Sequence, residues 1–194
     1  PLTVVVDPGI TLIVSNRNME NPIDAREMGE LGGPISLRDA NTLQGGAPRP
    51  SSLYTETGRQ PLYWNENSGS TSNRNGVLFQ FIQPIQAFGV WVSDVETRTT
   101  PNHGVVAFAR LFDSNGDWIS DHPIEPTLSI QEQANCGESS CVGCGNGTTR
   151  WIGFVSDIQV GAMLIVVGDD DSCPGNCDGN AEHISWIGAT IVLS

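Results

Sequence analysis

The sequence predicts an all-β protein, a jelly-roll-like β-sandwich with long surface loops. Short runs rich in Val, Ile, Leu and Phe recur along the chain, and clusters of Gly, Pro, Asn and Asp separate them. Almost no stretch has apolar residues at helical spacing. The 194 residues are enough to bury a sizeable core, and sandwiches of this length often form one domain. We therefore expect residues 1–194 to be a single β-sandwich domain.

Residues 1–14 contain two strand-like runs, Leu2–Val6 and Ile10–Val14, separated by the Asp7–Gly9 tripeptide. The tripeptide favours a turn, because Pro presets φ and Gly tolerates positive φ. The runs are predicted to form a hairpin or one strand bent at a bulge. An apolar terminal strand must be covered, either by its own sheet or by the open edge of a neighbouring copy. We expect Leu2–Val6 to reach outward and to join copies into a homo-oligomer or filament.

The following segment is predicted to contain little regular structure. Residues 21–31 have a weak helical spacing that allows one short helix, and Gly32, Gly33 and Pro34 would end it. Residues 36–75 are rich in Ser, Asn, Gly and Pro. They are predicted to form a long surface excursion and not a second domain.

Regular strands are expected from residue 76 onward. Val77, Phe79 and Phe81 alternate with other side chains, which predicts one apolar face. The Asn115-Gly116 pair predicts a β-hairpin, because tight hairpin turns need positive φ. The runs read as strands are Gly76–Ile82, Ile85–Asp94, Gly104–Phe112, Thr127–Gln131, Arg150–Ser156, Gly161–Val167 and Ile184–Leu193.

Three segments of this region precede a terminal apolar strand. They are Phe81–Asp94, Ala109–Asp117 and Trp151–Asp157. In this succession the chain resembles the secreted jelly-roll ectodomains of bacterial surface proteins, including those with PEP-CTERM sorting tails. The resemblance covers residues 76–193 and implies a jelly-roll fold. Those domains usually place an acidic pair before the last strand, where this chain has Glu182-His183.

Five cysteines lie in two Gly-rich loops that we expect to meet at one end of the sandwich. They are Cys136, Cys141, Cys144, Cys173 and Cys177. In an oxidising compartment such cysteines pair, so disulfides that link the two loops are the expectation. The alternative is tetrahedral zinc held by the last four of these thiolates, at spacings close to those of structural zinc sites.

The second cysteine loop also collects oxygen donors that are suited to calcium, which prefers about six to eight oxygen ligands. The candidate metal ligands are Asp169, Asp170, Asp171, Asp178 and Asn180. The alternative is a solvated acidic loop. The run Asp113–Asp117 resembles the start of a calcium loop but lacks the distal Glu, so a plain hairpin turn is predicted there.

Composition excludes several classes of partner. The net charge is −13 and the pI is near 4.3, so no basic surface exists to bind a nucleic acid backbone. No window reaches the roughly 20 apolar residues of a membrane span. A start at Pro1, with clustered cysteines, is what a processed chain in an oxidising compartment would have. We therefore expect an extracellular or cell-surface location.

The sequence contains no recognisable catalytic motif, so a non-enzymatic role is expected. The leading hypothesis is an extracellular structural protein, a self-assembling filament or surface-layer subunit. The alternative is a carbohydrate-binding module that stacks sugars on Trp64 and Trp118, which lie near turns. Trp91, Trp151 and Trp186 lie inside apolar strands and are predicted to be core residues.

Overall fold

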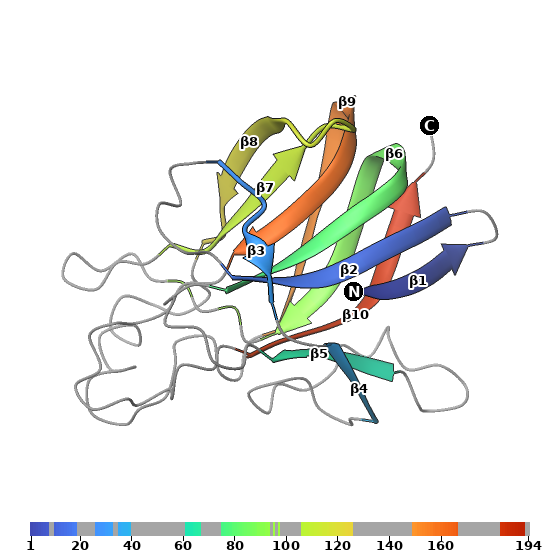
Figure 1. Cartoon of the computed structure of the whole chain (residues 1–194), viewed down its shortest axis with the longest axis vertical. Coiled ribbons are helices and arrows are strands. Elements are labelled where there is room, and N and C mark those ends of the chain that lie inside the picture. Colours follow the sequence, from blue (N-terminus) through green and yellow to red (C-terminus); the bar gives the residue numbers. More distant parts are fainter. Residues whose placement is uncertain are drawn as a thin grey trace.

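The computed structural model describes residues 1–7, 10–18, 26–32, 35–39, 61–66, 75–93, 95, 97, 106–125, 149–166 and 183–192. Within these residues the chain forms ten strands (Figure 1). Their bounds are β1 Leu2–Asp7, β2 Ile10–Asn18, β3 Glu30–Leu31, β4 Ile35–Asp39, β5 Pro61–Glu66, β6 Asn75–Ser93, β7 Phe108–Phe112, β8 Trp118–Pro123, β9 Thr149–Val166 and β10 His183–Val192.

The ten strands belong to one antiparallel sheet. Its main path runs in the order β4-β5-β10-β6-β9-β7-β8. A branch carrying β1, β2 and β3 joins the sheet where β2 pairs with β6. The predicted all-β class is therefore confirmed.

Two long strands, β6 and β9, pair with each other along most of their lengths and bend together. At the bend, residues 81–84 of β6 stand opposite residue 161 alone, and residues 156–159 of β9 stand opposite residue 86 alone. Such alternating bulges increase local twist and turn the sheet back on itself. Pro84 fits within the first bulge because it has no N–H to donate to a ladder. Gln86 Nε2 donates to the Asp157 carbonyl across the bend, at 3.3 Å.

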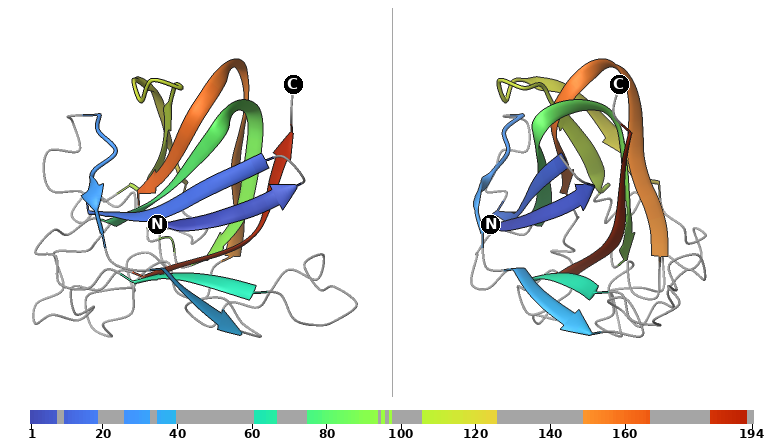
Figure 2. Two further views of the ribbon diagram at one scale, coloured as in Figure 1. Left: turned by 45° about the vertical axis from the view of Figure 1, so that its right-hand side comes forward. Right: turned by 90° about the vertical axis from the view of Figure 1, so that its right-hand side faces the viewer.

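The bend divides the sheet into two facing layers (Figure 2). The first layer contains β1, β2, the first half of β6, the second half of β9, β7 and β8. The second layer contains β4, β5, β10, the second half of β6 and the first half of β9. The curled sheet thus forms the predicted jelly-roll-like sandwich.

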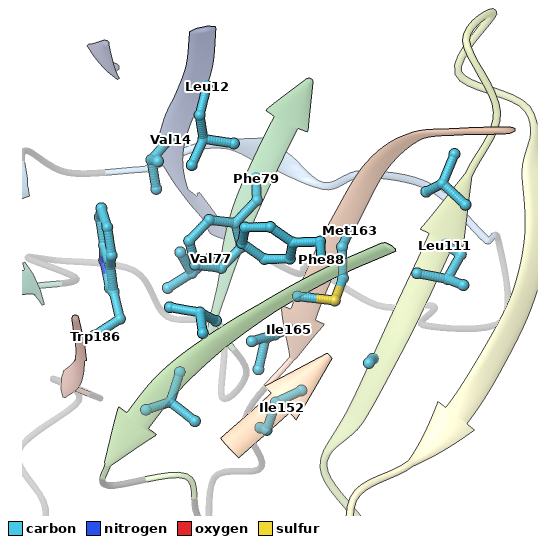
Figure 3. Packing of buried hydrophobic residues seen from close by; sticks show 14 of the residues in the cluster. Leu12, Val14, Val77, Phe79, Phe88, Leu111, Ile152, Met163, Ile165 and Trp186 are labelled. Atoms are coloured by element: carbon cyan, nitrogen blue, oxygen red, sulfur yellow. The ribbon is translucent and has the colours of Figure 1, made fainter. Parts of the chain in front are cut away.

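The main core lies between the two layers and is drawn in Figure 3. Phe79 comes from the first half of β6 and Phe88 from its second half, and their ring centroids are 5.3 Å apart. Trp186 of β10 is 1% exposed and meets Phe79 edge to face, with 5.4 Å between centroids. Truncating one buried aromatic of this kind typically costs about 3 to 5 kcal/mol. The core therefore holds the two halves of β6 in their bent arrangement.

A second apolar cluster covers the outer face of the first layer. Its buried members are Leu78, Phe108, Phe112, Ala162, Leu164 and Val166, and Met28 packs against them. Leu78 lies between the core residues Val77 and Phe79 on β6, so its side chain points to the opposite face. In this layer, β6 and β9 are therefore buried on both faces.

Residues 26–32 lie over this cluster and are tied down by three hydrogen bonds. Arg110 Nη1 donates to the Glu27 carbonyl at 3.2 Å, Arg17 Nη1 donates to the Gly29 carbonyl at 3.3 Å, and Gly32 N donates to the Asn16 carbonyl at 2.8 Å. The helix that residues 21–31 allowed is absent from the described part, residues 26–31. Arg26 and Gly29 have φ values of 56° and 73°, which a right-handed helix cannot contain.

The sheet tests several other predictions from the sequence. Leu2–Asp7 and Ile10–Asn18 form a hairpin, one of the two arrangements predicted for them, so β1 pairs with β2 of its own chain. The expectation that Leu2–Val6 reaches outward is wrong, because its backbone is paired within its own sheet. β7 and β8 form the predicted second hairpin, with Gly116 at φ 86°. β4 and β5 lie in or beside residues 36–75, which were predicted to be irregular because of their polar composition. β4 pairs with β5, and β5 pairs with β10. The expected strand at 127–131 falls outside the described residues.

An ion pair between a buried arginine and a partly exposed aspartate fastens the β7–β8 hairpin. Arg110 is 1% exposed, and its Nε and Nη2 donate to the two carboxylate oxygens of Asp121 at 2.7 and 2.8 Å. Partial burial acts to raise the pKa of Asp121, but hydrogen bonds from Arg110 and Trp118 and the charge of Arg110 outweigh it, so the pKa is lowered. A buried arginine without its carboxylate partner would carry an uncompensated charge.

Asp121 should therefore make the free energy of unfolding depend on pH. Because its pKa is depressed in the fold, its contribution is complete above the unfolded value of about 3.9 and disappears as pH falls through the folded value. Asp121→Asn should lower the free energy of unfolding by about 2 kcal/mol at pH 7, a figure reduced for the partial exposure of Asp121. The variant should also lose less stability as pH falls below about 4, because it lacks the carboxylate that becomes protonated there.

Urea unfolding followed by circular dichroism at several pH values would measure both effects. Asp117→Asn is the matched control, since Asp117 is an exposed carboxylate in the turn of the same hairpin. Equal stabilities of Asp121→Asn and the wild type at pH 7 would contradict the role assigned to the pair.

Candidate functional site

The outer face of the second layer contains the candidate site. On β6, Phe88, Val90 and Val92 point into the core, so Gly89 and Trp91 lie on the outer face. The register aligns these two residues with Gly153 and Trp151 of β9. Two glycines therefore stand side by side on adjacent strands, next to a pair of tryptophans.

The indole of Trp151 lies across Gly89. A Cβ atom at Gly89 would overlap the Cζ2 atom of Trp151, and Gly89 is buried although its side of the sheet is the outer one. Trp91 meets Trp151 edge to face, with ring centroids 5.4 Å apart and planes inclined at 70°. Trp151 nevertheless remains 45% exposed. The fold thus holds a large indole against the sheet while leaving much of it open to solvent.

Gly153 has a different reason to be glycine. A Cβ atom there would overlap the Phe88 carbonyl oxygen and come within 2.8 Å of the Gly89 Cα atom. The backbones of β6 and β9 therefore approach closely at this point. Glycine inside a strand commonly marks such an approach.

Beside Trp151 the surface is hollowed into a groove of about 330 Å³. The described residues that line it are Ala87, Phe88, Gly89, Trp151, Gly153, Phe154, Val155 and Thr190. Among these residues only the indole N–H of Trp151 and the hydroxyl of Thr190 are polar side-chain groups. A mainly apolar concavity with a few polar groups is the usual form of a small-molecule site, and this volume is at the small end of that range.

The tryptophans differ from expectation in an informative way. Trp186 is buried, as predicted. Trp91 is half-buried and lies on the outer face, so the prediction that it is a core residue is wrong. The prediction that Trp151 is a core residue is wrong, because its neighbour Ile152 occupies the core side and alternation turns Trp151 outward.

Trp118, one of the two predicted sugar-stacking residues, is 36% exposed. The Arg26 guanidinium covers its ring at 3.8 Å from the centroid, and its Nε1 donates to Asp121 Oδ1 at 3.0 Å. One face of the Trp118 ring is therefore covered by Arg26, and its indole nitrogen is already hydrogen-bonded to Asp121. Trp64, the other residue, lies in β5, opposite Ser185 of β10 and Ser36 of β4. The two predicted residues are on different layers and do not form one platform.

The predicted metal and disulfide residues fall outside the described residues. They are Asp169, Asp170, Asp171, Asp178, Asn180, Cys136, Cys141, Cys144, Cys173 and Cys177. Within the ranges that the structure describes, no group of three or more His, Cys, Asp and Glu side chains is placed to hold a metal ion. In the same ranges no helix is long and apolar enough to cross a membrane.

Asp113 organises a hairpin turn. Its Oδ1 accepts hydrogen bonds from the backbone N–H groups of Asn115 and Asp117, at 2.8 and 2.9 Å. The bond from Asp117 is the main reason that the pKa of Asp113 is lowered. This geometry accounts for the Asp113–Asp117 run as the plain hairpin turn that was predicted.

No protein-family model matches the sequence, and no curated protein matches it. Among solved structures, the chain is similar to the enzymatically active domain of tailspike protein 4 from bacteriophage CBA120. The identity is 11%, the match covers 93% of this chain and 19% of that chain, and the TM-score is 0.36. It is also similar to the catalytic domain of a GH87 alpha-1,3-glucanase in complex with tetrasaccharides, at 10% identity, 95% and 28% coverage and a TM-score of 0.36.

A third similar structure is the family 32 carbohydrate-binding module from C. perfringens NanJ in complex with galactose. The identity is 10%, the match covers 92% of this chain and all of that chain, and the TM-score is 0.31. This chain spans 19% and 28% of the lengths of the first two structures.

The two groove glycines should respond differently to an added methyl group. In Gly89→Ala the three atoms nearest to the methyl group all belong to the exposed Trp151 side chain, which can shift outward, so the loss of stability should stay below about 1 kcal/mol. In Gly153→Ala the methyl group meets the backbone of β6, and the loss should reach about 1 to 3 kcal/mol. Urea unfolding would give both values, and near-ultraviolet circular dichroism would report the displaced indole. A larger loss for Gly89→Ala would contradict this account.

Proposed function

We propose that this protein is a carbohydrate-binding module and that the groove beside Trp151 is its binding site. The observation that carries the proposal is the half-exposed indole held against Gly89 on an otherwise exposed sheet face. A saccharide ring has C–H faces that are apolar and an edge of hydroxyl groups that is polar. An indole provides a flat apolar surface with a polar N–H at its rim, which is complementary to such a ligand.

The groove suits a ligand that binds without rearrangement of the sheet. Trp91 supports the indole, and the floor is the close-packed backbone at Gly89 and Gly153. A pre-formed platform costs little conformational entropy on binding. With one stacking ring and few polar groups, the affinity for one or two sugar units should be modest, with Kd on the order of 1 mM, equivalent to about −4 kcal/mol.

In this role the protein acts by attachment and performs no catalysis. It works outside the cell or at the cell surface, where the cysteines would form disulfides and polymeric glycans are available as partners. Calcium at the acidic loop and zinc at the cysteines remain predictions of the sequence.

Removing the indole tests the proposal directly. Glycan-array screening should find saccharide ligands for the wild type, and Trp151→Ala should weaken their binding at least tenfold in calorimetric titration, because the stacking surface is lost. Trp118→Ala is the matched control, since it removes another exposed tryptophan and leaves the groove intact. If Trp151→Ala bound saccharides as tightly as the wild type and Trp118→Ala did not bind them, the groove would be rejected as the binding site. Trp118, the residue predicted from the sequence, would then be the stacking residue.

A second candidate function is assembly through β1, as a filament or surface-layer subunit. The observation that favours it is the position of β1, which pairs with β2 on one side and has no strand on the other in the described part of the chain. Leu2–Val6 contains no charge and no proline, the residues that commonly protect an edge strand, whereas β8 carries Asp121 and Pro123. An unprotected edge can accept a strand from another copy.

Deleting residues 1–6 should then separate assembly from folding. β2 keeps its partner β6, so the shortened chain should remain folded, while association of the intact chain at high concentration should disappear. Sedimentation velocity with circular dichroism would measure both properties. Identical association of the two chains, or a monomeric intact chain at millimolar concentration, would count against this second function.

A further inference from the structure

Charge distinguishes the groove from the rest of this acidic protein. The chain has a net charge of −13, yet none of the described residues that line the groove is ionisable at neutral pH. Asp157 is exposed at the bend, two residues beyond Val155 of the groove. A ligand that approaches the groove therefore meets a protein of negative net charge and, among these lining residues, no cation that could pair with a carboxylate or sulfate.

Arg150, the arginine nearest in sequence to Trp151, does not supply a cation to the groove. Arg150 directly precedes Trp151 on β9, so alternation places its side chain on the opposite face of the sheet. It is half-buried, and its Nη1 donates to the Glu125 carbonyl at 2.7 Å. Burial lowers the pKa of Arg150, because desolvation disfavours the charged guanidinium.

Beside the indole N–H of Trp151, the described lining residues include one hydroxyl group that is suited to orient a sugar. Thr190 of β10 is exposed, and the register places it opposite Gly89, the residue that the Trp151 indole covers. Adjacent strands are about 5 Å apart, so the hydroxyl of Thr190 stands beside the stacking surface and not beneath it. A hydroxyl both donates and accepts hydrogen bonds, as the hydroxyl groups of a sugar do.

We infer that the groove selects an uncharged saccharide, with Trp151 stacking on the ring face and Thr190 binding a hydroxyl at the ring edge. The inference rests on the proposed function and names its ligand class and its orienting residue. Two contacts in different directions, one below the ring and one at its edge, define how the sugar lies. Uronic acids and sulfated sugars of the same shape are rejected by charge.

The test compares neutral and acidic sugars on wild type and one variant. The probes are methyl β-galactoside and methyl β-glucoside, their uronic acid counterparts, and deoxy analogues that each lack one hydroxyl group, titrated by NMR at 20 and 500 mM NaCl. We expect a neutral sugar to bind with a Kd that changes less than twofold with salt. The uronic acids should bind at least tenfold more weakly at 20 mM NaCl, with part of the difference removed at 500 mM NaCl.

Thr190→Val retains the shape and removes the hydroxyl. It should raise the Kd for the bound neutral sugar about threefold to tenfold, the range expected for one hydrogen bond. It should leave the Kd unchanged for the one deoxy analogue that lacks the partner hydroxyl. Thr3→Val on β1 is the matched control, since Thr3 is an exposed threonine in the other layer. Thermal unfolding of each variant checks that the fold is retained.

The outcomes separate the inference from the proposed function. Tighter binding of uronic acids that is lost in Trp151→Ala would overturn the inference and leave the groove as a glycan site. Equal effects of Thr190→Val on every deoxy analogue, or no effect at all, would overturn the role of Thr190. No binding of any saccharide in this panel or in the glycan array would reject the proposed function, and the inference with it.

Discussion

The shared bend of β6 and β9 is the constraint on which the rest of the structure depends. The two strands stay paired on both sides of the bend. They turn because each strand contributes a bulge at a point where the other strand has only one residue opposite it. Without the bend, Phe79 and Phe88 would lie far apart along one strand, and no interior would exist. With it, both rings meet in the core, and β2 and β10 become neighbours of the same strand in opposite layers. A local irregularity in backbone pairing therefore creates both layers at once.

The two outer faces that result have opposite characters. On the first layer, Met28 and its segment cover the outer cluster, and the ion pair of Arg110 with Asp121 fixes the neighbouring hairpin. On the second layer, Trp151 stays 45% exposed and Val155 90% exposed. Both of these side chains line the groove of about 330 Å³ on this face. The same alternation that fills the core thus presents the indole to solvent.

Much of the fold could be predicted from the sequence, but the site could not. Alternation in Val77–Phe81 and the Asn115-Gly116 turn are local signals, and the corresponding strands formed as expected. β4 and β5 gave no such signal, because their order depends on pairing with β10 far along the chain. The apolar run around Trp151 led to the prediction that this residue is in the core, although a period of two places Trp151, Gly153 and Val155 together on one face. Glycine within strands, at 89 and 153, was the clue that would have marked this face.

The sequence by itself determined the class of this protein: the all-β architecture, the hairpins and the acidic charge follow from composition and local pattern, because turns and strand periodicity act over a few residues. Only the tertiary structure decided which side of each strand faces the core and which glycine lies under which ring. Trp186 and Trp151 occupy similar apolar runs, yet one is 1% exposed and the other 45%. Their difference arises from the register between strands that are distant in sequence, and register sets which face each side chain shares with its neighbours.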